Sequence, residues 1–331
     1  MTDEPRPLVA ITGATGFTGG ALASRLTSDG YAVRALARRA PSDDVEARAT
    51  EWLVGGLTDP EAIAQLVKGA DTCFHIAAMY RTEGAAEEFL HINRDSTALL
   101  LKAARDAGVR RFVYCSSIGV HGDVHSGVAD ESAPFSPRDP YQQSKLLAEQ
   151  LCREQMSEPG MEIVVVRPCG IYGPGDTRML KMFSMLQKGT FVYVGQGKSH
   201  FHPVYIDDLV DGFMLAMQQP AAAGQTFIIG AAEHLPLRDY VATAARALNV
   251  PAPKRHLPYG PVNVAAHACE ILCAPLKVEP PLHRRRLTFF KHHRAFTINR
   301  ARSLLGYAPK VGLAEGFRRT VDWYRHEGML R

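Results

Sequence analysis

Short apolar runs alternate with amphipathic segments over the first half of the chain. The apolar runs predict strands at Leu8–Thr12, Tyr31–Leu36, Glu51–Val54, Thr72–Ile76, Arg111–Cys115 and Glu162–Val166. Several intervening segments carry apolar residues three or four positions apart. They predict helices ending at Asp29 and covering Pro60–Val67, Ala85–Ala107 and Tyr141–Met156. Strands that alternate with helices form a parallel sheet covered on both faces, and right-handed connections favour a doubly wound arrangement.

This alternation stops after about residue 175. A short methionine-rich helix is expected over Met179–Leu186, and the strand-like stretches Pro203–Ile206 and Thr226–Ile229 are expected to return to the sheet. From Pro236 onward the pattern is helical, with proline-rich connections. We therefore expect a dinucleotide-binding domain made of residues 1–177 and about 201–232. A smaller, mainly C-terminal substrate-binding cap would contain residues 178–200 and 233–331.

The composition is that of a globular protein. Of the 331 residues, 46% are hydrophobic and 22% are charged, which excludes a disordered chain, a collagen-like repeat and a coiled coil. The net charge of +4 is modest and argues against a dedicated nucleic-acid binder. The N-terminus has no apolar signal core, and no apolar run approaches the ~20 residues that span a bilayer. These features predict a cytoplasmic protein that does not insert into a membrane.

Cysteine and histidine patterns give no sign of a metal centre. The six cysteines contain no Cys-x-x-Cys pair, so reduced thiols are expected. No histidine spacing matches a helical His-Glu-x-x-His site or a mixed Cys/His site. No bound metal is therefore predicted.

A glycine-rich turn follows the first predicted strand. Gly13, Gly16 and Gly19 stand three residues apart and open the first helix. Such a turn lets the backbone approach a pyrophosphate, while the helix N-terminus supplies free N–H groups and the positive end of its dipole. The turn therefore predicts a dinucleotide site, with a tight turn that binds nothing as the alternative.

The end of the second strand bears on the choice of dinucleotide. A carboxylate there would bind the adenosine ribose of NAD, whereas a cation would accept the additional phosphate of NADP. The chain has Ala37 followed by Arg38 and Arg39, with no acid. Arg38 is a candidate for the 2′-phosphate, or else a solvated surface arginine. NADP(H) is the preferred prediction, with NAD(H) as the alternative.

Three polar residues form a candidate catalytic set. Tyr141 and Lys145 are four apart on a predicted helix and so share one face. A lysine ammonium beside a tyrosine favours the phenolate, which predicts that Lys145 lowers the pKa of Tyr141 and makes it an acid or base near neutral pH. Ser117 follows the strand Arg111–Cys115, where a hydroxyl faces the ligand edge of a parallel sheet. Ser117 would hold a carbonyl or alkoxide oxygen while Tyr141 moves the proton.

With these motifs the chain resembles the extended short-chain dehydrogenase/reductases. That superfamily includes the NAD-dependent epimerase/dehydratases, 3β-hydroxysteroid dehydrogenases and dihydroflavonol reductases. The resemblance covers nearly the whole chain. Its further motifs are His75–Ala78, His91–Thr97, Val120–Gly122, Arg167–Asp176, Val204–Asp208, Leu305–Pro309 and Gly316–Tyr324. It implies a doubly wound Rossmann domain with a small cap, and the site between the two.

The resemblance also implies residue roles. Tyr141 would be the acid/base, Lys145 would bind the nicotinamide ribose, Ser117 would polarise the reacting oxygen, and Asn93 would order the cofactor site. The cofactor-binding set implied in this way is Gly13, Thr15, Gly16, Phe17, Thr18, Gly19, Arg38, Leu57, Ala77, Ala78, Asn93, Tyr141, Lys145, Pro168, Gly170 and Ile171. The candidate substrate contacts are Met79, Ser117, His121, Met179 and Phe201.

Departures from the family pattern narrow the chemistry. Gly55-Gly56 replaces the usual Gly-Asp after the third strand, which puts the adenine contact in doubt, and Asp59 comes only later. Ile118-Gly119 replaces the Asp-Glu pair of 4,6-dehydratases, so dehydration is disfavoured. Phe201 stands where nucleotide-sugar epimerases commonly have a phosphate-binding arginine. Lys198, His200 or the run Arg284–Arg286 would be possible substitutes, although that run also fits a solvated face.

The predicted function is hydride transfer between a nicotinamide and a secondary alcohol or ketone carbon of a fairly apolar small molecule. The Met-rich helix Met179–Leu186 and residues 262–276 would supply an apolar wall, or else belong to the core. A nucleotide-sugar 4-epimerase with tightly bound NAD is the first alternative, and a non-catalytic dinucleotide-binding sensor is the second. A homodimer is expected from the resemblance.

Overall fold

The computed structural model describes residues 7–80, 85–124, 127–273, 278, 284–291 and 293–331. Residues 1–6 of the polar N-terminus, on which the expectation of no signal segment rests, lie outside this range. So do residues 274–276 of the stretch predicted as an apolar wall. The side chains of Arg285 and Arg286, considered above as phosphate ligands, are also outside the description.

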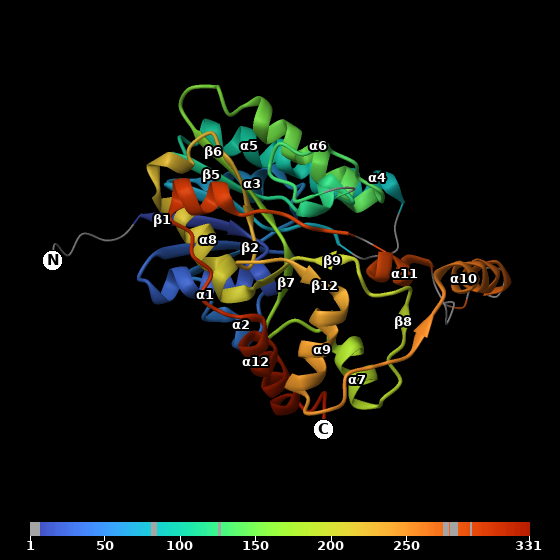
Figure 1. Ribbon diagram of the computed structural model, residues 1–331. Helices are drawn as coiled ribbons and strands as arrows, with labels where there is room; N and C mark the ends of the chain where they lie inside the picture. The colour runs from blue at the N-terminus through green and yellow to red at the C-terminus, as the bar shows by residue number, and fades with distance from the viewer. Residues whose placement is uncertain (1–6, 81–84, 125–126, 274–277, 279–283, 292) are drawn as a thin grey trace.

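Seven parallel strands form the central sheet in the order β11-β6-β5-β4-β1-β2-β3 (Figure 1). Their bounds are β1 Leu8–Thr12, β2 Ala32–Ala37, β3 Glu51–Val54, β4 Thr72–His75, β5 Arg111–Cys115, β6 Glu162–Pro168 and β11 Thr226–Ile229. The chain builds outward from β1 to β3 and then crosses to β4. The predicted doubly wound sheet is confirmed, and its switch point lies between β1 and β4, where such sheets bind ligands.

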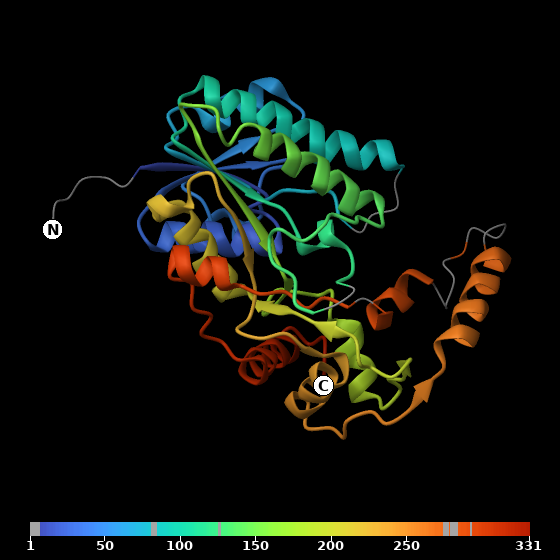
Figure 2. The same ribbon diagram turned by 45° about the horizontal axis from the view of Figure 1, so that its top comes forward.

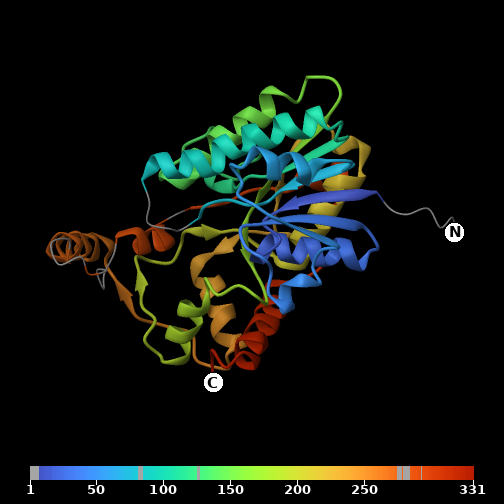
Figure 3. The ribbon, with the colours of Figure 1, turned by 180° about the vertical axis from the view of Figure 1, so that it is seen from behind.

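Helices cover both faces of this sheet (Figures 1 and 3). On one face α3 (Pro60–Val67) and α6 (Pro140–Glu154) pack against α5 (Ser96–Asp106). On the other, α1 (Phe17–Ser28) packs against α8 (Ile206–Gln218). The central strands β1, β4, β5, β6 and β11 are buried on both sides, which is why they are largely apolar rather than alternating, whereas the edge strand β3 is partly exposed.

Side chains of β5 show how one strand serves two cores. Phe112 and Tyr114 join the cluster that α3 and α5 cover, whereas Val113 and Cys115 join the larger cluster on the opposite face. Successive residues of a strand point to opposite faces, so the two clusters share β5 without sharing side chains. This places Ser116 and Ser117 immediately beyond a strand that is fixed from both sides.

The remaining elements form a smaller part of the molecule (Figures 1 and 2). They are α7 Leu180–Gln187, β8 Tyr193–Val194, β9 His200–Phe201, β12 Leu235–Pro236, α9 Leu237–Ala247, β13 His256–Leu257, α10 Tyr259–Cys273, α11 Arg284–Lys291 and α12 Leu313–His326. Helix α9 packs against both α7 and α12. Short pairs β12–β9 and β13–β8 connect this part internally. Helix α10 stands away from the rest in Figure 2, and Val264, Ile271 and Leu272 on it are exposed.

Residues 293–297, here called the C-terminal strap, return from the cap to the sheet. The His293 carbonyl accepts a hydrogen bond from Val124 N at 2.8 Å, and Arg294 N donates to the His200 carbonyl at 2.8 Å. The strap also exchanges backbone hydrogen bonds with Ala129 on both sides of Phe296. Further along, the Tyr307 hydroxyl donates to the Gly230 carbonyl at 2.9 Å. The C-terminal segment is therefore tied to the nucleotide-binding half by main-chain contacts.

Two sequence expectations require correction. Pro203–Tyr205 (β10) does not join the main sheet; it pairs with β7 (Gly170–Tyr172) in a separate two-stranded sheet. The expected helix Ala85–Ala107 is divided into α4 (Ala86–Phe89), a π-helical turn at Leu90–Asp95 and α5. In the Met-rich helix, Met182, Phe183 and Leu186 are buried, which agrees with the alternative that this helix belongs to the core, whereas Met179, Leu180 and Met185 are half-buried. A short helix, α2 (Asp43–Glu46), was not expected.

Two kinds of feature are absent from the described residues. No helix among them combines the length and apolar character that crossing a bilayer requires. They also bring no three metal-binding side chains together. The six cysteines are free thiols, and four of them are buried.

Buried histidines make the fold acid-sensitive. Burial lowers the pKa of His202 to about 4, and Nδ1 of this ring has no hydrogen-bond partner among the described residues. The unfolded chain binds a proton near pH 6.5 while the folded one does not, so stability falls as the pH drops from about 6.5 toward 4. We expect His202 to cost about 2 kcal/mol of unfolding free energy at pH 5 relative to pH 7.5.

Urea unfolding at pH 7.5 and 5 tests this expectation. His202→Gln should lose about 2 kcal/mol less stability than the wild type between these two pH values. The exposed His326→Gln serves as the control and should lose as much as the wild type. An equal pH dependence in wild type and His202→Gln would show that His202 is not held neutral by burial.

Candidate active site

The glycine turn is shaped by close packing at the end of β1. Gly13 has a φ of 82°, a conformation that side chains rarely adopt, and a Cβ there would lie 2.8 Å from Ala77 N. A Cβ on Gly19 would collide with the Gly13 carbonyl oxygen. The two glycines therefore allow β1, α1 and the loop after β4 to meet. This contact brings Ala77 and Ala78, both predicted cofactor residues, to the glycine turn.

The N-terminus of α1 is equipped for an anion. Gly16 is its N-cap, no side chain caps the first N–H groups, and the first turn has no acid. By contrast, α3 and α6 are capped by the carboxylates of Asp59 and Asp139. Unsatisfied N–H groups at a helix start bind phosphate through hydrogen bonds and the helix dipole. The residues present thus fit the pyrophosphate of a dinucleotide, with Thr15 and Gly16 exposed at the turn.

A buried histidine network joins the glycine turn to the helix after β4. Nδ1 of His75 lies 2.8 Å from the Thr12 hydroxyl, and Nε2 lies 3.0 Å from the Thr97 hydroxyl. The Thr97 hydroxyl donates to the Asn93 carbonyl at 2.6 Å, so it accepts from Nε2–H, and the Thr12 hydroxyl donates to Nδ1. Burial lowers the pKa of His75 to about 3, which keeps this neutral tautomer. The Thr12 oxygen also accepts from Ala77 N at 3.2 Å.

Asn93 positions the loop after β4 and the start of α6 together. Its Oδ1 accepts from Met79 N at 2.7 Å and its Nδ2 donates to the Met79 carbonyl at 3.1 Å. The same amide nitrogen lies 2.8 Å from the Ser144 hydroxyl, which donates to the Tyr141 carbonyl at 2.8 Å. Asn93 sits in the π-helical turn, a geometry often found at functional sites. Asn93 therefore acts on the site through the backbone of Met79 and Tyr141.

The structure brings the three candidate catalytic residues to one edge of the sheet. Ser117 follows β5, and its Oγ accepts from Gly119 N at 3.0 Å, which leaves its hydroxyl hydrogen free to donate. Ser116 instead donates to the buried Glu149 at 2.6 Å, so the two serines are separated into structural and site roles. Helix α6 begins at Pro140 after the Asp139 cap, which fixes Tyr141 in its first turn.

The electrostatics of the pair Tyr141 and Lys145 differ from the expectation. Burial raises the pKa of Tyr141, Tyr80 and Cys115 raise it further, and Arg178 is the cation that lowers it. Burial also lowers the pKa of Lys145, whose Nζ lies 4.2 Å from the centre of the Tyr114 ring. The prediction that Lys145 lowers the pKa of Tyr141 is therefore wrong for the polypeptide alone, because desolvation of the phenolate dominates.

Sequence reasoning missed three residues that lie at the predicted site. The Tyr80 ring centre lies 4.8 Å from that of Tyr141, edge to face. Arg178 donates to the Ile171 carbonyl at 2.9 Å and lies over the Phe17 ring at 5.5 Å, so it connects the residues after β6 with the glycine turn. Nη1 of Arg48 lies 3.5 Å from the Ala14 carbonyl on the same turn. Only Arg178 had a signal in the sequence, since it lies two residues after the motif Arg167–Asp176.

The other predicted cofactor residues occupy ends of strands or the loops after them. Pro168 is the last residue of β6, and Gly170 and Ile171 lie in β7. Leu57 is half-buried in the loop between β3 and α3. Asp59, the late acid of that loop, accepts from Glu61 N and Ala62 N as the cap of α3 and is occupied there. Arg38 is exposed at the end of β2.

The candidate substrate residues differ in their burial and in whether other protein groups already contact them. Met79 is half-buried in the loop that Asn93 holds, and the Met179 sulfur accepts from the Tyr240 hydroxyl at 3.2 Å. Phe201 lies directly over Gly170, where a Cβ would meet its ring. His121 is buried, with Nε2 2.9 Å from an Arg167 nitrogen and Nδ1 3.2 Å from the Pro134 carbonyl. Since both ring nitrogens have protein partners, this packing argues against His121 as a substrate contact.

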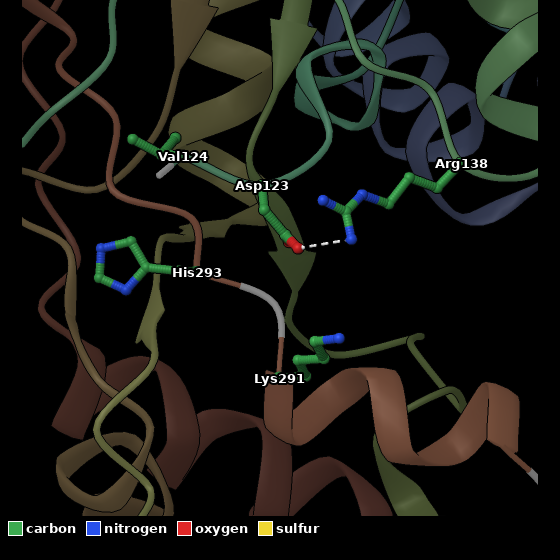
Figure 4. A pocket seen from close by; sticks show the side chains of 5 residues that line it. All are labelled: Asp123, Val124, Arg138, Lys291 and His293. Atoms are coloured by element: carbon green, nitrogen blue, oxygen red, sulfur yellow. Dashed lines mark ion pairs between the residues drawn. The ribbon is translucent and has the colours of Figure 1, made fainter. Parts of the chain in front are cut away.

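A cavity of about 380 Å³ opens beside the start of α6. Figure 4 shows Asp123 pointing toward Arg138, with which it forms an ion pair of 3.0 Å. Lys291 and His293 line the same cavity from the C-terminal part of the chain. The cavity therefore adjoins the strap and lies beside the segment that precedes Tyr141.

Known proteins resemble this chain in sequence and in fold. The NAD dependent epimerase/dehydratase family matches residues 9–230. The chain is 31% identical to a 3 beta-hydroxysteroid dehydrogenase/Delta 5-->4-isomerase of Mycobacterium tuberculosis, over 96% of this chain and 90% of the relative. It is 28% identical to the 2-alkyl-3-oxoalkanoate reductase of Stenotrophomonas maltophilia, over 94% and 97% of the two chains.

A solved structure has the same fold as this chain. DesIV, a dTDP-glucose 4,6-dehydratase of Streptomyces venezuelae solved with NAD and TYD bound, superposes with a TM-score of 0.77 at 25% identity. The similarity covers 98% of this chain and 99% of that one. The fold, the glycine turn and these relatives all indicate the same family and the same type of cofactor. The chain belongs to the NAD-dependent epimerase/dehydratase family of extended short-chain dehydrogenase/reductases and is an enzyme with a nicotinamide cofactor.

Proposed function

We propose that this enzyme transfers hydride between a nicotinamide and the secondary alcohol or ketone carbon of a small molecule, with Tyr141 as the acid/base. The observation that supports this proposal is the common position of Ser117, Tyr141 and Lys145. Ser117 follows β5, and the other two lie one helical turn apart in α6, which packs against the same sheet. Relatives named as a dehydrogenase and as a reductase of a 3-oxo acid carry out this type of chemistry.

Each residue has a distinct task in the proposed reaction. When bound, the nicotinamide supplies or accepts the hydride at its C4 atom. The Ser117 hydroxyl donates a hydrogen bond to the substrate oxygen and orients it. Tyr141 donates its phenolic proton to that oxygen during reduction and accepts it during oxidation. Lys145 holds the nicotinamide ribose and lies one helical turn from Tyr141 on the same helix.

The proposed cofactor contacts are the residues that the sequence predicted. Phe17 and Thr18 present backbone N–H groups to the pyrophosphate, and Ala77 and Ala78 line the dinucleotide. Pro168, Gly170 and Ile171 lie near the nicotinamide, with Arg178 as an addition because it binds the Ile171 carbonyl. Helix α1, with its uncapped N-terminus, supports this set.

We propose NADP(H) as the preferred cofactor because Arg38 is exposed at the end of β2, where no carboxylate is present. Replacing Arg38 by alanine removes a charge-assisted contact to the 2′-phosphate. Arg38→Ala should weaken NADPH binding about tenfold and leave NADH binding unchanged. Titration of both cofactors by quenching of protein fluorescence measures the two dissociation constants.

Arg39→Ala is the matched control, since Arg39 is also exposed and adjacent in sequence. It should change neither constant by more than about twofold. Equal losses for NADPH and NADH in Arg38→Ala, or tighter binding of NADH by the wild type, would contradict the proposed cofactor preference.

The second candidate is a nucleotide-sugar 4-epimerase, favoured by the DesIV likeness with its bound NAD. Phe201, packed over Gly170, supports the reductase instead, because it offers no charge to a substrate phosphate. Native mass spectrometry of the freshly purified protein separates the two. Protein that arrives empty, binds NADPH and reduces members of a ketone panel supports the reductase. Tightly held NAD at one per chain, with turnover of UDP- or dTDP-sugars and none of ketones, would overturn it.

Three further features remain proposals. We propose a nucleotide-binding domain made of residues 1–177 and about 201–232, and a cap made of residues 178–200 and 233–331. The turn Ala301–Leu305 belongs to the cap by this division, but it contacts α8 and β11, so part of the cap segment packs against the main sheet. We propose a cytoplasmic location on the basis of the free thiols. A homodimer is proposed from family resemblance, and sedimentation velocity would test it.

A further inference from the structure

Arg294 in the C-terminal strap is half-buried, and its guanidinium has no hydrogen-bond partner among the described residues. Its backbone is fixed, because its N–H donates to the His200 carbonyl at 2.8 Å and the neighbouring Ala295 carbonyl accepts from Ala129 N at 2.9 Å. Its Nε is buried and makes no hydrogen bond to any described residue. Within the described chain no carboxylate forms an ion pair with it either. Proteins pair buried cations, since an unpaired one loses hydration without compensation.

The surroundings of Arg294 place it at the ligand edge of the sheet. The groups whose charges act on it are Asp123, Tyr80, Asp139 and Cys169. These residues follow β5, β4 and β6 or precede Tyr141 directly, so they surround the carboxyl ends of the strands. Tyr80 in turn lies edge to face against Tyr141 at 4.8 Å. Arg294 is therefore on the side of the molecule where the proposed substrate binds.

The nearby aspartates are already engaged. Asp123 forms an ion pair with Arg138 at 3.0 Å, as Figure 4 shows. The Asp139 carboxylate caps α6 by accepting from Gln142 N at 2.8 Å. Burial lowers the pKa of Arg294, but a guanidinium remains a cation at any physiological pH. Within the part of the chain that the structure describes, this positive charge therefore has no paired acid and is available to an anionic ligand.

We propose that Arg294 binds the carboxylate of the substrate, so that the enzyme acts on an oxo or hydroxy acid. The inference rests on the proposed function and deepens it by naming the substrate class. A planar guanidinium matches a single carboxylate through two parallel hydrogen bonds. A nucleoside diphosphate brings more negative charge, and it would meet one arginine with two aspartates close by.

The reaction balances with this assignment. In reduction, hydride passes from the nicotinamide C4 to the carbonyl carbon, and the proton of Tyr141 passes to the carbonyl oxygen. The carboxylate at Arg294 is unchanged and serves only to hold the acid. Arg294 is therefore a substrate-binding residue that selects anionic over neutral substrates.

Matched substrates test the assignment. We would measure reduction of 3-oxooctanoate and of its methyl ester by NADPH in wild type, Arg294→Met and Arg302→Met. Arg294→Met should lower kcat/KM for the acid about 30-fold and for the ester less than about threefold. Arg302 is an exposed arginine beyond the strap, and its variant should resemble the wild type. A wild type that prefers the ester, or an equal loss for both substrates, would overturn the proposal and leave the reductase function standing.

A binding measurement separates this proposal from the proposed function. Octanoate carries the carboxylate and lacks the reacting oxygen, so its binding needs no turnover. Calorimetry should show octanoate binding to the wild type and at least about tenfold weaker binding to Arg294→Met. Arg294→Met should also melt at the wild-type temperature or higher, because it removes a half-buried charge that has no partner among the described residues. Equal octanoate binding by both proteins, or loss of UDP-glucose binding only, would refute a carboxylate site at Arg294.

Discussion

Tyr141→Phe should reduce kcat by about 10²- to 10⁴-fold, the usual contribution of a positioned acid/base. The substitution keeps the ring, which packs edge to face against Tyr80 at 4.8 Å, and removes only the hydroxyl. Helix α6 would be undisturbed because its cap, Asp139, is retained. NADPH binding should therefore change by less than about threefold. Steady-state rates with a ketone that the wild type reduces, together with a cofactor titration, give both quantities.

The variant Tyr80→Phe is the informative comparison with Tyr141→Phe. It is the tyrosine packed against Tyr141, and it was not among the residues expected from sequence. Tyr31→Phe, on the far side of the sheet beside Gln218, serves as the control and should keep the rate within about twofold. If Tyr141→Phe retains more than a tenth of the activity while Tyr80→Phe loses it, Tyr80 is the acid/base and our assignment of Tyr141 is wrong.

Glu149→Ala should destabilise the protein by about 3–5 kcal/mol. Glu149 and Arg167 are both buried and form an ion pair behind the catalytic strand end. The carboxylate also accepts from the Ser116 hydroxyl at 2.6 Å, and Arg167 also donates to the Glu131 carbonyl at 2.8 Å. Removing the acid leaves the Arg167 charge buried without its partner. A drop in Tm on the order of 10 °C should follow.

Two further variants test whether this loss of stability comes from the Glu149–Arg167 ion pair. Glu154→Ala, at the exposed end of the same helix, should lie within about 0.5 kcal/mol of the wild type. The double variant Glu149→Leu/Arg167→Met should recover much of the stability, because it removes both charges together. A Glu149→Ala protein that melts within 2 °C of the wild type would mean that Arg167 reaches water or another acid in solution.

The sequence was sufficient for the features that depend on local pattern. Apolar runs and glycine spacing predicted the doubly wound sheet and the turn at Gly13–Gly19, since the central strands are buried on both faces and Gly13 and Gly19 have contacts that exclude a side chain. Strand-like residues alone did not predict the partner of Pro203–Tyr205. That stretch pairs with β7, a separate short strand that begins at Gly170, just beyond the end of β6.

Features that depend on contacts between distant parts of the chain could not be predicted from the sequence. The pKa of Tyr141 is decided by burial next to Tyr80, a residue more than fifty positions away in the chain. Arg294 looked like one more basic residue in a basic segment, and only the strap places it among Asp123, Asp139 and Tyr80. His121 had the sequence context of a substrate contact, yet Arg167 and Pro134 occupy its ring.

The strap has a consequence for recombining this enzyme with its relatives. Because residues 293–297 bond to Val124, Ala129 and His200, the end of the chain is interleaved with the nucleotide-binding half. Tyr307 and the backbone of Lys310 and Val311 add bonds to Gly230 and Asp208. A chimera that exchanges everything after residue 233 would break all of these pairs. Grafts that exchange only residues 178–199 and 233–291 keep them, so these two segments of the cap can be exchanged while the last forty residues, which include Arg294, stay with their own sheet.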